Sequence, residues 1–150
     1  MKKVIAFGTF DRFHAGHESY LRQAKFLGSS LIVVIARDQT VKRIKGRLPN
    51  DNEKERKAAV KAHGAADKVI LGELSDKYAV IRKHKPDIIA LGYDQFAFTY
   101  RLKKFLIDRG LNSKIIRMKP YKPAVYKTSI LRNSLGLNNE ISTYAAFKEQ

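Results

Sequence analysis

Two histidines near the start of the chain have the types and the spacing for chemistry on a phosphate. His14 and His17 are separated by two residues, and one of these, Gly16, has no side chain. Both imidazoles can therefore face one anion while a phosphate oxygen approaches the backbone. Because imidazole N–H groups donate hydrogen bonds to oxygen, the pair indicates an anion site.

The flanking residues predict a strand before the histidines and a helix after them. Residues 4–7 are apolar and partly β-branched, as in a buried strand, and Gly8 allows a sharp turn. Residues 16–27 carry apolar side chains at helical spacing, and Gly28 follows as a helix stop. The histidines therefore fall at a strand-to-helix junction, where a parallel sheet places its ligands and a helix start favours phosphate.

Two other interpretations of the histidines compete with a phosphate site. They could form part of a metal site, but the chain has no cysteine and Asp11 is the one obvious third ligand nearby. They could also be ordinary surface histidines. The pattern of Gly8 to Asp11 and His14 to His17 at a strand-to-helix junction favours the phosphate interpretation.

Composition and charge limit the class of protein. At 150 residues and 44% hydrophobic, the chain is long enough for one domain with a sizeable core. Lys+Arg 30 against Asp+Glu 14 gives a net charge of +16, which attracts nucleotides, phosphorylated metabolites or nucleic acid without choosing among them. The lack of cysteine excludes disulfides and thiolate chemistry. No apolar run approaches a membrane span, so we expect a cytoplasmic protein with no membrane partner.

The motif around the histidines resembles a known signature. Gly8-Thr9-Phe10-Asp11 followed by His14-Ala15-Gly16-His17 is similar to the HxGH signature of the nucleotidyltransferase superfamily, which includes cytidylyltransferases, coenzyme-forming adenylyltransferases and class I aminoacyl-tRNA synthetase domains. The string from Lys85 to Gln95, with Ala36-Arg37-Asp38, resembles the archaeal FAD synthase branch in particular. The resemblance covers nearly all of residues 1–132.

Strand and helix patterns alternate along the chain, which predicts an α/β fold. Strands are expected at residues 31–36, 66–72, 87–91 and 114–118, and helices at 53–62, 76–83 and 97–109. The resemblance implies a Rossmann-like open parallel sheet of five strands in the order 3-2-1-4-5 with helices on both faces. We expect a nucleotidyltransferase domain at 1–135 and a polar C-terminal tail at 136–150.

Residues 40–52 have no periodicity and are rich in lysine and arginine, so we expect a loop. A basic run is usually solvated surface, but this one follows a strand that adjoins the histidine motif. The resemblance implies a mobile phosphate clamp, with Lys45 and Arg47 as the best matches. It also implies that Arg56, on the next helix, points inward as part of that clamp.

Two further motifs match the family in part. Asp94 follows a strand and a glycine, where it could cap the next helix or, by the resemblance, bind the nucleotide. Thr128 and Ser129 precede a short helix with Arg132 and resemble the second signature of the family. Ile130 stands where cytidylyltransferases carry a lysine, which leaves the choice of nucleotide open.

The resemblance implies a reaction without an enzyme nucleophile. An acceptor phosphate attacks the α-phosphorus of a nucleoside triphosphate and pyrophosphate leaves, so the protein aligns the groups and stabilises charge. The implied catalytic residues are His14, His17 and Lys45, and the implied phosphate or acceptor clamp is Lys45, Arg47 and Arg56. The implied nucleotide-binding residues are Thr9, Phe10, His14, Ala15, Gly16, His17, Asp94, Tyr121, Thr128, Ser129 and Arg132.

The leading substrates are ATP and FMN, which would give FAD. Glycerol-3-phosphate cytidylyltransferase-like chemistry with CTP is the alternative, and phosphopantetheine or nicotinamide mononucleotide is a further possible acceptor. We expect a divalent cation, Mg²⁺, held through the triphosphate without protein metal ligands, and a homodimer. A different class, a basic nucleic-acid-binding module, would explain the charge but leave the histidine motif without a purpose, so we expect no nucleic-acid partner.

Overall fold

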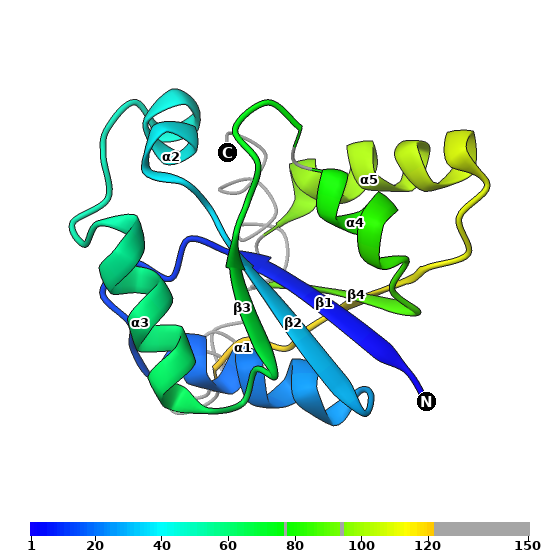
Figure 1. Cartoon of the computed structure of the whole chain (residues 1–150), viewed down its shortest axis with the longest axis horizontal. Helices are drawn as coiled ribbons and strands as arrows, with labels where there is room; N and C mark the ends of the chain where they lie inside the picture. Colours follow the sequence, from blue (N-terminus) through cyan, green and yellow to red (C-terminus); the bar gives the residue numbers. More distant parts are fainter. Residues whose placement is uncertain (77, 94, 122–150) are drawn as a thin grey trace, which may run out of the picture.

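Five parallel strands form one sheet in the order β3-β2-β1-β4-β5, which confirms the predicted α/β fold and strand order. The computed structural model describes residues 1–76, 78–93 and 95–121 (Figure 1). The strands are β1 (Lys3–Gly8), β2 (Ser30–Ile35), β3 (Lys68–Leu71), β4 (Ile88–Leu91) and β5 (Lys114–Arg117). The predicted positions at Asp94, Thr128, Ser129 and Arg132 and the tail at 136–150 lie outside the described residues.

β1 lies at the point where the strand order reverses. Its pairing with β2 continues to the last residue, Gly8, which is opposite Ile35. Its pairing with β4 ends earlier, at Ala6 opposite Ala90. The sheet therefore opens between β1 and β4 at its carboxyl edge, which is where open α/β sheets bind their ligands.

Helices cover both faces of the sheet, as predicted, because alternate strand residues point to opposite sides (Figure 1). Val4 and Ala6 of β1 belong to the core that includes α1 (Ala15–Phe26) and α3 (Glu53–His63). Ile5 belongs to the other core, with α4 (Ala79–His84) and α5 (Phe96–Arg109). Each β1 residue from Val4 to Ala6 is fully buried, so β1 is covered on both sides.

The prediction of a loop over residues 40–52 is wrong for its first half, which forms α2 (Asp38–Lys45). Val41 is the single buried residue of this helix, and its other apolar side chain, Ile44, lies one turn later, a helical spacing that the prediction of a loop did not use. Basic side chains in the last turn of α2 interact favourably with the negative end of the helix dipole. Gly46 then ends the helix with a φ of 80°, a left-handed conformation that glycine adopts readily.

The other helices begin and end close to the predicted residues. Asn52 caps α3 by accepting a hydrogen bond from the Glu55 amide at 2.8 Å, as one of the expected caps. α4 begins at Ala79 rather than 76, and β3 begins at Lys68 rather than 66. None of the helices in the described ranges combines the length and the apolarity needed to cross a bilayer.

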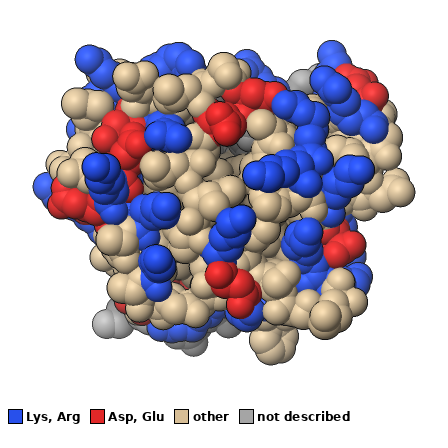
Figure 2. All heavy atoms as spheres, viewed as in Figure 1, with Lys and Arg blue, Asp and Glu red and all other residues tan. Residues whose placement is uncertain are grey.

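Positive charge is distributed over the surface in several places. Figure 2 shows Lys and Arg side chains spread across one face, with Asp and Glu side chains among them. On this face the charge is not gathered into a single stripe of the kind that follows a nucleic-acid backbone.

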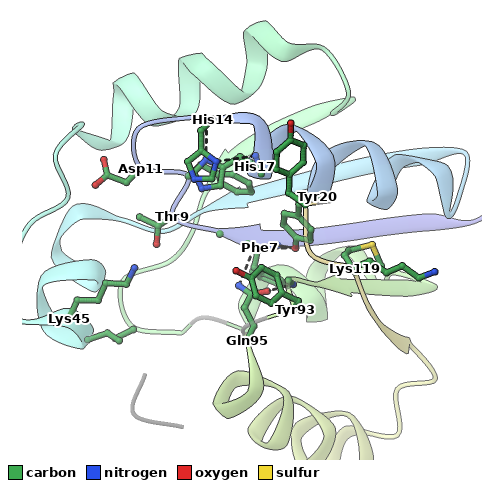
Figure 3. Close-up of a pocket in the computed structure, with 17 residues that line it drawn as sticks. Phe7, Thr9, Asp11, His14, His17, Tyr20, Lys45, Tyr93, Gln95 and Lys119 are labelled. Carbon is green, nitrogen blue, oxygen red and sulfur yellow. Dashed lines mark hydrogen bonds between the residues drawn. The ribbon is translucent and has the colours of Figure 1, made fainter. Parts of the chain in front are cut away.

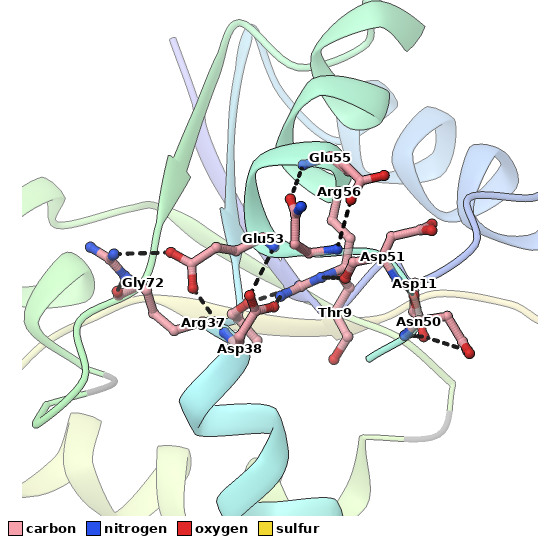
Figure 4. A network of polar contacts seen from close by, with 12 residues as sticks. Thr9, Asp11, Arg37, Asp38, Asn50, Asp51, Glu53, Glu55, Arg56 and Gly72 are labelled. Carbon is pink, nitrogen blue, oxygen red and sulfur yellow. Dashed lines mark hydrogen bonds and ion pairs between the residues drawn. The ribbon is translucent and has the colours of Figure 1, made fainter. Parts of the chain in front are cut away.

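Arg56 of α3 joins three segments at the carboxyl edge of the sheet (Figure 4). It is 1% exposed, and its Nη1 donates to the carbonyls of Thr9 and Ala36, both at 2.8 Å. Its Nε donates to the Asp51 carbonyl at 3.0 Å, and its Nη2 is paired with Asp38 at 2.7 Å. The prediction that Arg56 belongs to a phosphate clamp is therefore wrong, because acceptors of the protein itself take its buried guanidinium.

The same network holds the start of α2 against the start of α3. The Asp38 amide donates to Glu53 at 3.0 Å, and the Glu53 amide donates back to Asp38 at 3.2 Å. Arg37 pairs with Glu53 at 3.1 Å and donates to the Gly72 carbonyl beyond β3 at 2.8 Å (Figure 4). These bonds connect the ends of β2 and β3 to the two helices that flank the carboxyl edge.

Replacement of Arg56 by methionine should lower the free energy of unfolding by about 3 kcal/mol or more, because it leaves buried carbonyls and one carboxylate without their donor. Urea denaturation followed by circular dichroism measures this change. Arg47→Met, at an exposed position, is the matched control and should have little effect. An Arg56→Met variant as stable as the control would contradict the structural role of the guanidinium.

Candidate active site

A cleft of about 590 Å³ lies where β1 and β4 separate at the carboxyl edge (Figure 3). It is bordered by the segment after β1, the start of α1, the end of α2, and the segments after β4 and β5. The described residues that line it are Phe7, Gly8, Thr9, Phe10, Asp11, His14, Gly16, His17, Tyr20, Ile44, Lys45, Gly92, Tyr93, Gln95, Met118, Lys119 and Tyr121.

Side chains bridge β1 and β4 beyond the point where their pairing ends. The Tyr20 hydroxyl donates to the Ala90 carbonyl at 2.7 Å and accepts from the Phe7 amide at 3.3 Å. Gln95 donates to the Phe7 carbonyl at 3.2 Å and accepts from the Gly92 amide at 2.7 Å. Tyr20 and Gln95 thus satisfy strand groups that a continued ladder would have paired, and the cleft remains open between the strands.

The two histidines cap α1 with their own side chains. His14 is the N-cap residue, and its Nδ1 accepts a hydrogen bond from the Gly16 amide at 3.0 Å. The Nδ1 of His17 accepts in turn from the His14 amide at 3.2 Å. This is the reciprocal arrangement of a capping box, with imidazoles in place of the usual hydroxyl and carboxylate.

The cap determines which nitrogen of each ring can act on a ligand. Since both Nδ1 atoms accept hydrogen bonds, the proton of each neutral imidazole is on Nε2, which makes Nε2–H a donor. The rings of His14 and His17 are stacked, with centroids 3.8 Å apart and an interplanar angle of 23°. Two N–H donors therefore lie side by side at the start of α1 and at the border of the cleft (Figure 3).

Gly16 is required by the packing of this cap. A Cβ atom at this position would lie 2.8 Å from Cε1 and 3.0 Å from Nδ1 of His14, so any side chain would displace the ring. The sequence suggested a different reason for Gly16, the approach of a phosphate to the backbone. The structure adds that the Gly16 amide is already bonded to His14.

Aromatic rings surround His17. Phe10 contacts it edge-on at 5.4 Å between centroids, and Phe13 stacks on it at 5.6 Å. Burial, together with the charge of His14, lowers the pKa of His17 to about 4, although Asp11 opposes the shift. His17 is therefore neutral at pH 7 and available as a hydrogen-bond donor.

The loop after β1 is held in an unusual backbone conformation. Phe10 and Arg12 have φ angles of 57° and 49°, which residues with side chains rarely adopt. Asp11 anchors the loop by accepting from the amides of Asn50 and Asp51, both at 2.8 Å. Burial alone would raise the pKa of Asp11, but these hydrogen bonds outweigh it and lower the pKa. Asp11 therefore stays ionised as a structural anchor.

The structure brings most of the described candidate residues to the cleft. Thr9, Phe10, His14, Gly16, His17, Lys45 and Tyr121 line it. Ala15 and Arg47 are exposed and are not among the lining residues, and Arg56 is buried. Among the described ranges of the chain, no group of three His, Cys, Asp or Glu side chains could hold a metal ion.

Sequence reasoning missed several lining residues. Tyr20 fitted the apolar face of the first helix and was not assigned to the site. Its hydroxyl, which needs a hydrogen-bond partner when it is buried, was the feature that could have indicated its role. Gln95 stood inside a recognised string but received no role. Met118 and Lys119 follow the last strand of the sheet, and the parallel topology alone would have placed them at this edge.

A Rossmann-like sheet with a histidine-capped helix start at its switch point defines an α/β nucleotidyltransferase. The chain belongs to the Cytidylyltransferase-like family, whose model matches residues 5–134. It is 42% identical to the FAD synthase of Archaeoglobus profundus over 130 residues, 86% of this chain and 82% of that protein. It is 36% identical to the FAD synthase of Thermococcus sibiricus over 95% of this chain and 94% of that protein.

A solved structure has the same fold and a similar sequence. The lipopolysaccharide core biosynthesis protein from Thermoplasma volcanium is 39% identical and superposes with a TM-score of 0.75. The match covers 81% of this chain and 98% of that chain. The fold, the site and these relatives together make the protein a nucleotidyltransferase enzyme.

The free energy of unfolding should fall as the pH is lowered from 6.5 toward 4. In the unfolded chain the pKa of His17 is near 6.5, whereas in the folded protein it is about 4. Between these two pH values the unfolded state binds a proton that the folded state does not, so protons favour unfolding. His17→Gln keeps an acceptor for the His14 amide and removes the titrating group, so it should reduce this pH dependence.

Urea denaturation at several pH values between 4 and 7.5 measures the effect. Arg22→Gln, at an exposed position of the same helix, is the control and should keep the dependence of the wild type. An unchanged pH profile in His17→Gln would show that His17 does not titrate as described.

Proposed function

We propose that the protein transfers the adenylyl group of ATP to the phosphate of FMN and releases pyrophosphate, with FAD as the product. The observation that carries the proposal is the pair of stacked imidazoles with both Nδ1 atoms engaged in the cap of α1. The choice of ATP and FMN rests on the relatives that are FAD synthases.

The reaction needs alignment and charge stabilisation rather than a protein nucleophile. An oxygen of the acceptor phosphate forms a bond to the α-phosphorus, the bond to the β-phosphate bridging oxygen breaks, and pyrophosphate leaves with that oxygen. Nε2–H groups of His14 and His17 would donate to phosphate oxygens on which charge develops. Because the aromatic surroundings keep His17 neutral, it donates without itself losing or gaining a proton.

Lys45 is the cationic partner of this pair in our proposal. It lines the cleft from the end of α2, while the histidines line it from the start of α1 (Figure 3). A lysine there would hold the outer phosphates and the leaving pyrophosphate. Arg47, Asp94, Thr128, Ser129 and Arg132 remain predicted contributors to phosphate or nucleotide binding.

The rest of the lining suits planar rings. Phe7, Tyr93, Met118 and Tyr121 bring aromatic and thioether groups to a cleft that polar side chains also line. Such walls bind heteroaromatic ligands such as a purine or an isoalloxazine through stacking and apolar contact. We propose that Thr9 and the Phe10 backbone contact the nucleotide near its phosphates.

The divalent cation of our proposal, Mg²⁺, enters as part of the substrate, bound to the triphosphate. Among the described residues, no group of three His, Cys, Asp or Glu side chains could hold this ion, and we propose no protein ligand for it. A homodimer remains a prediction, which light scattering coupled to size-exclusion chromatography would test.

Purified protein should release pyrophosphate and form FAD when incubated with ATP, FMN and Mg²⁺. Chromatography of the flavin products, together with a pyrophosphate assay, measures both. Reactions with CTP, and with glycerol 3-phosphate, phosphopantetheine or nicotinamide mononucleotide as acceptor, are the comparisons. Faster turnover of CTP with glycerol 3-phosphate would favour the cytidylyltransferase alternative. Salt-dependent duplex binding without any pyrophosphate release would favour a nucleic-acid-binding module.

His17→Ala should lower kcat by about two orders of magnitude or more, the scale seen when a preorganised donor is removed. His84→Ala is the matched control, because His84 is partly exposed at the end of α4 and does not line the cleft. Near-normal turnover in His17→Ala would contradict its catalytic role.

A further inference from the structure

Gln23 of α1 binds both backbone groups of Lys119, a residue 96 positions later in the chain. Its Nε2 donates to the Lys119 carbonyl at 3.0 Å, and its Oε1 accepts from the Lys119 amide at 2.8 Å. Nε2 also donates to the Ser19 hydroxyl one turn earlier at 3.1 Å. The amide of Gln23 thus uses its oxygen and both N–H groups, which defines its orientation.

The segment that Gln23 holds is a wall of the cleft. Met118, Lys119 and Tyr121 all line the cavity, whereas Gln23 does not. Tyr121 is where this wall meets the start of α1, because its Cβ is 3.9 Å from where a Cβ on Gly16 would be. Met118 is buried and its amide donates to the Leu91 carbonyl at 2.7 Å, so the wall continues from the edge of the sheet.

One helix therefore sets two parts of the cleft. The first turn of α1 presents the stacked imidazoles. Gln23, on the same helix, holds the segment after β5 through its hydrogen bonds to Lys119. A helix rises about 1.5 Å per residue, so the six residues from His17 to Gln23 separate these points by roughly 9 Å in a rigid element. The separation between the imidazoles and the point at which Gln23 holds Lys119 is therefore built into the helix.

The wall is suited to the base rather than to the phosphates. In Figure 3, Lys45 and Lys119 lie at opposite sides of the view, with the histidines between them. In the proposed function, the outer phosphates extend toward Lys45, so the nucleoside extends toward residues 118–121. Met118 and Tyr121 there offer a thioether and an aromatic ring, which are common partners of planar heterocycles.

We propose that Gln23 is a positioning residue that sets the place of the base-binding wall and so determines affinity for, and choice of, the nucleotide. The proposal rests on the nucleoside triphosphate part of the proposed function. Gln23 acts through the backbone of Lys119 and does not touch the substrate. Its loss should therefore affect ligands that carry a base and spare ligands that consist of phosphates alone.

Gln23→Leu, a variant of similar size without hydrogen-bonding groups, tests this in the full-length protein. Isothermal titration calorimetry with ATP, CTP and inorganic tripolyphosphate, each with Mg²⁺, measures the binding split. We expect ATP affinity to fall by about 10-fold or more, as when a group is displaced from its aligned position, and tripolyphosphate affinity to change by less than about 2-fold. The ratio of ATP to CTP affinity should also change. Arg22→Leu, the adjacent exposed position of α1, is the matched control and should leave all three affinities unaltered.

Two outcomes would overturn the proposal: ATP binding as tight as in the wild type, or equal losses for ATP and tripolyphosphate, which a general disturbance of the fold would produce. The tripolyphosphate measurement thus separates misplacement of the wall from unfolding. A wild type that binds ATP but forms no FAD would refute the proposed acceptor and leave this test intact. A wild type that binds no ATP would overturn both.

Discussion

The reciprocal cap at the start of α1 is the interaction on which the proposed chemistry depends. An ordinary cap only satisfies helix amides, but here each cap acceptor is the Nδ1 atom of an imidazole. Cap formation therefore selects the tautomer and orients the second nitrogen. The stacked rings and the absence of a side chain at Gly16 keep the pair in this geometry before any ligand binds. Preorganised donors of this kind need little rearrangement when charge develops on a phosphate.

The cleft exists because two neighbouring strands stop pairing before they end. Side chains take over where the ladder stops: Tyr20 from α1 and Gln95 from the segment after β4 bond to the backbone of Phe7. Gln23 plays a similar part for the segment after β5. Each of these side chains forms hydrogen bonds with backbone groups that a longer pairing of the strands would have bonded. The cleft therefore leaves few backbone groups without a hydrogen-bond partner. The walls of the site are consequently held by α1 as much as by the sheet.

Arg56 shows how a charge can be buried without serving a ligand. Three carbonyls and the Asp38 carboxylate receive its hydrogen bonds, and they come from the segments after β1 and β2, the segment before α3 and the start of α2. A buried guanidinium with these partners holds the loop after β1 in place. Together with the Asp11 anchor, it stabilises the positive φ angles of Phe10 and Arg12. The family resemblance predicted that this arginine points inward, but it did not identify the acceptor atoms to which the guanidinium donates.

The sequence by itself determined the alternation of strands and helices, the burial of β1, and the position of the histidines at a strand-to-helix junction. These features follow from the periodicity of apolar residues and from the positions of glycines, and both can be recognised within a few consecutive residues. The tertiary structure decided that residues 38–45 form a helix, because their two apolar side chains are too few to establish one, whereas contacts with α3 hold its first residue in place. It also decided the roles of Arg56, Tyr20 and Gln23, since their partners are backbone atoms brought near by folding. Backbone groups are the same at every residue, so no side-chain pattern marks which of them a distant side chain will bind.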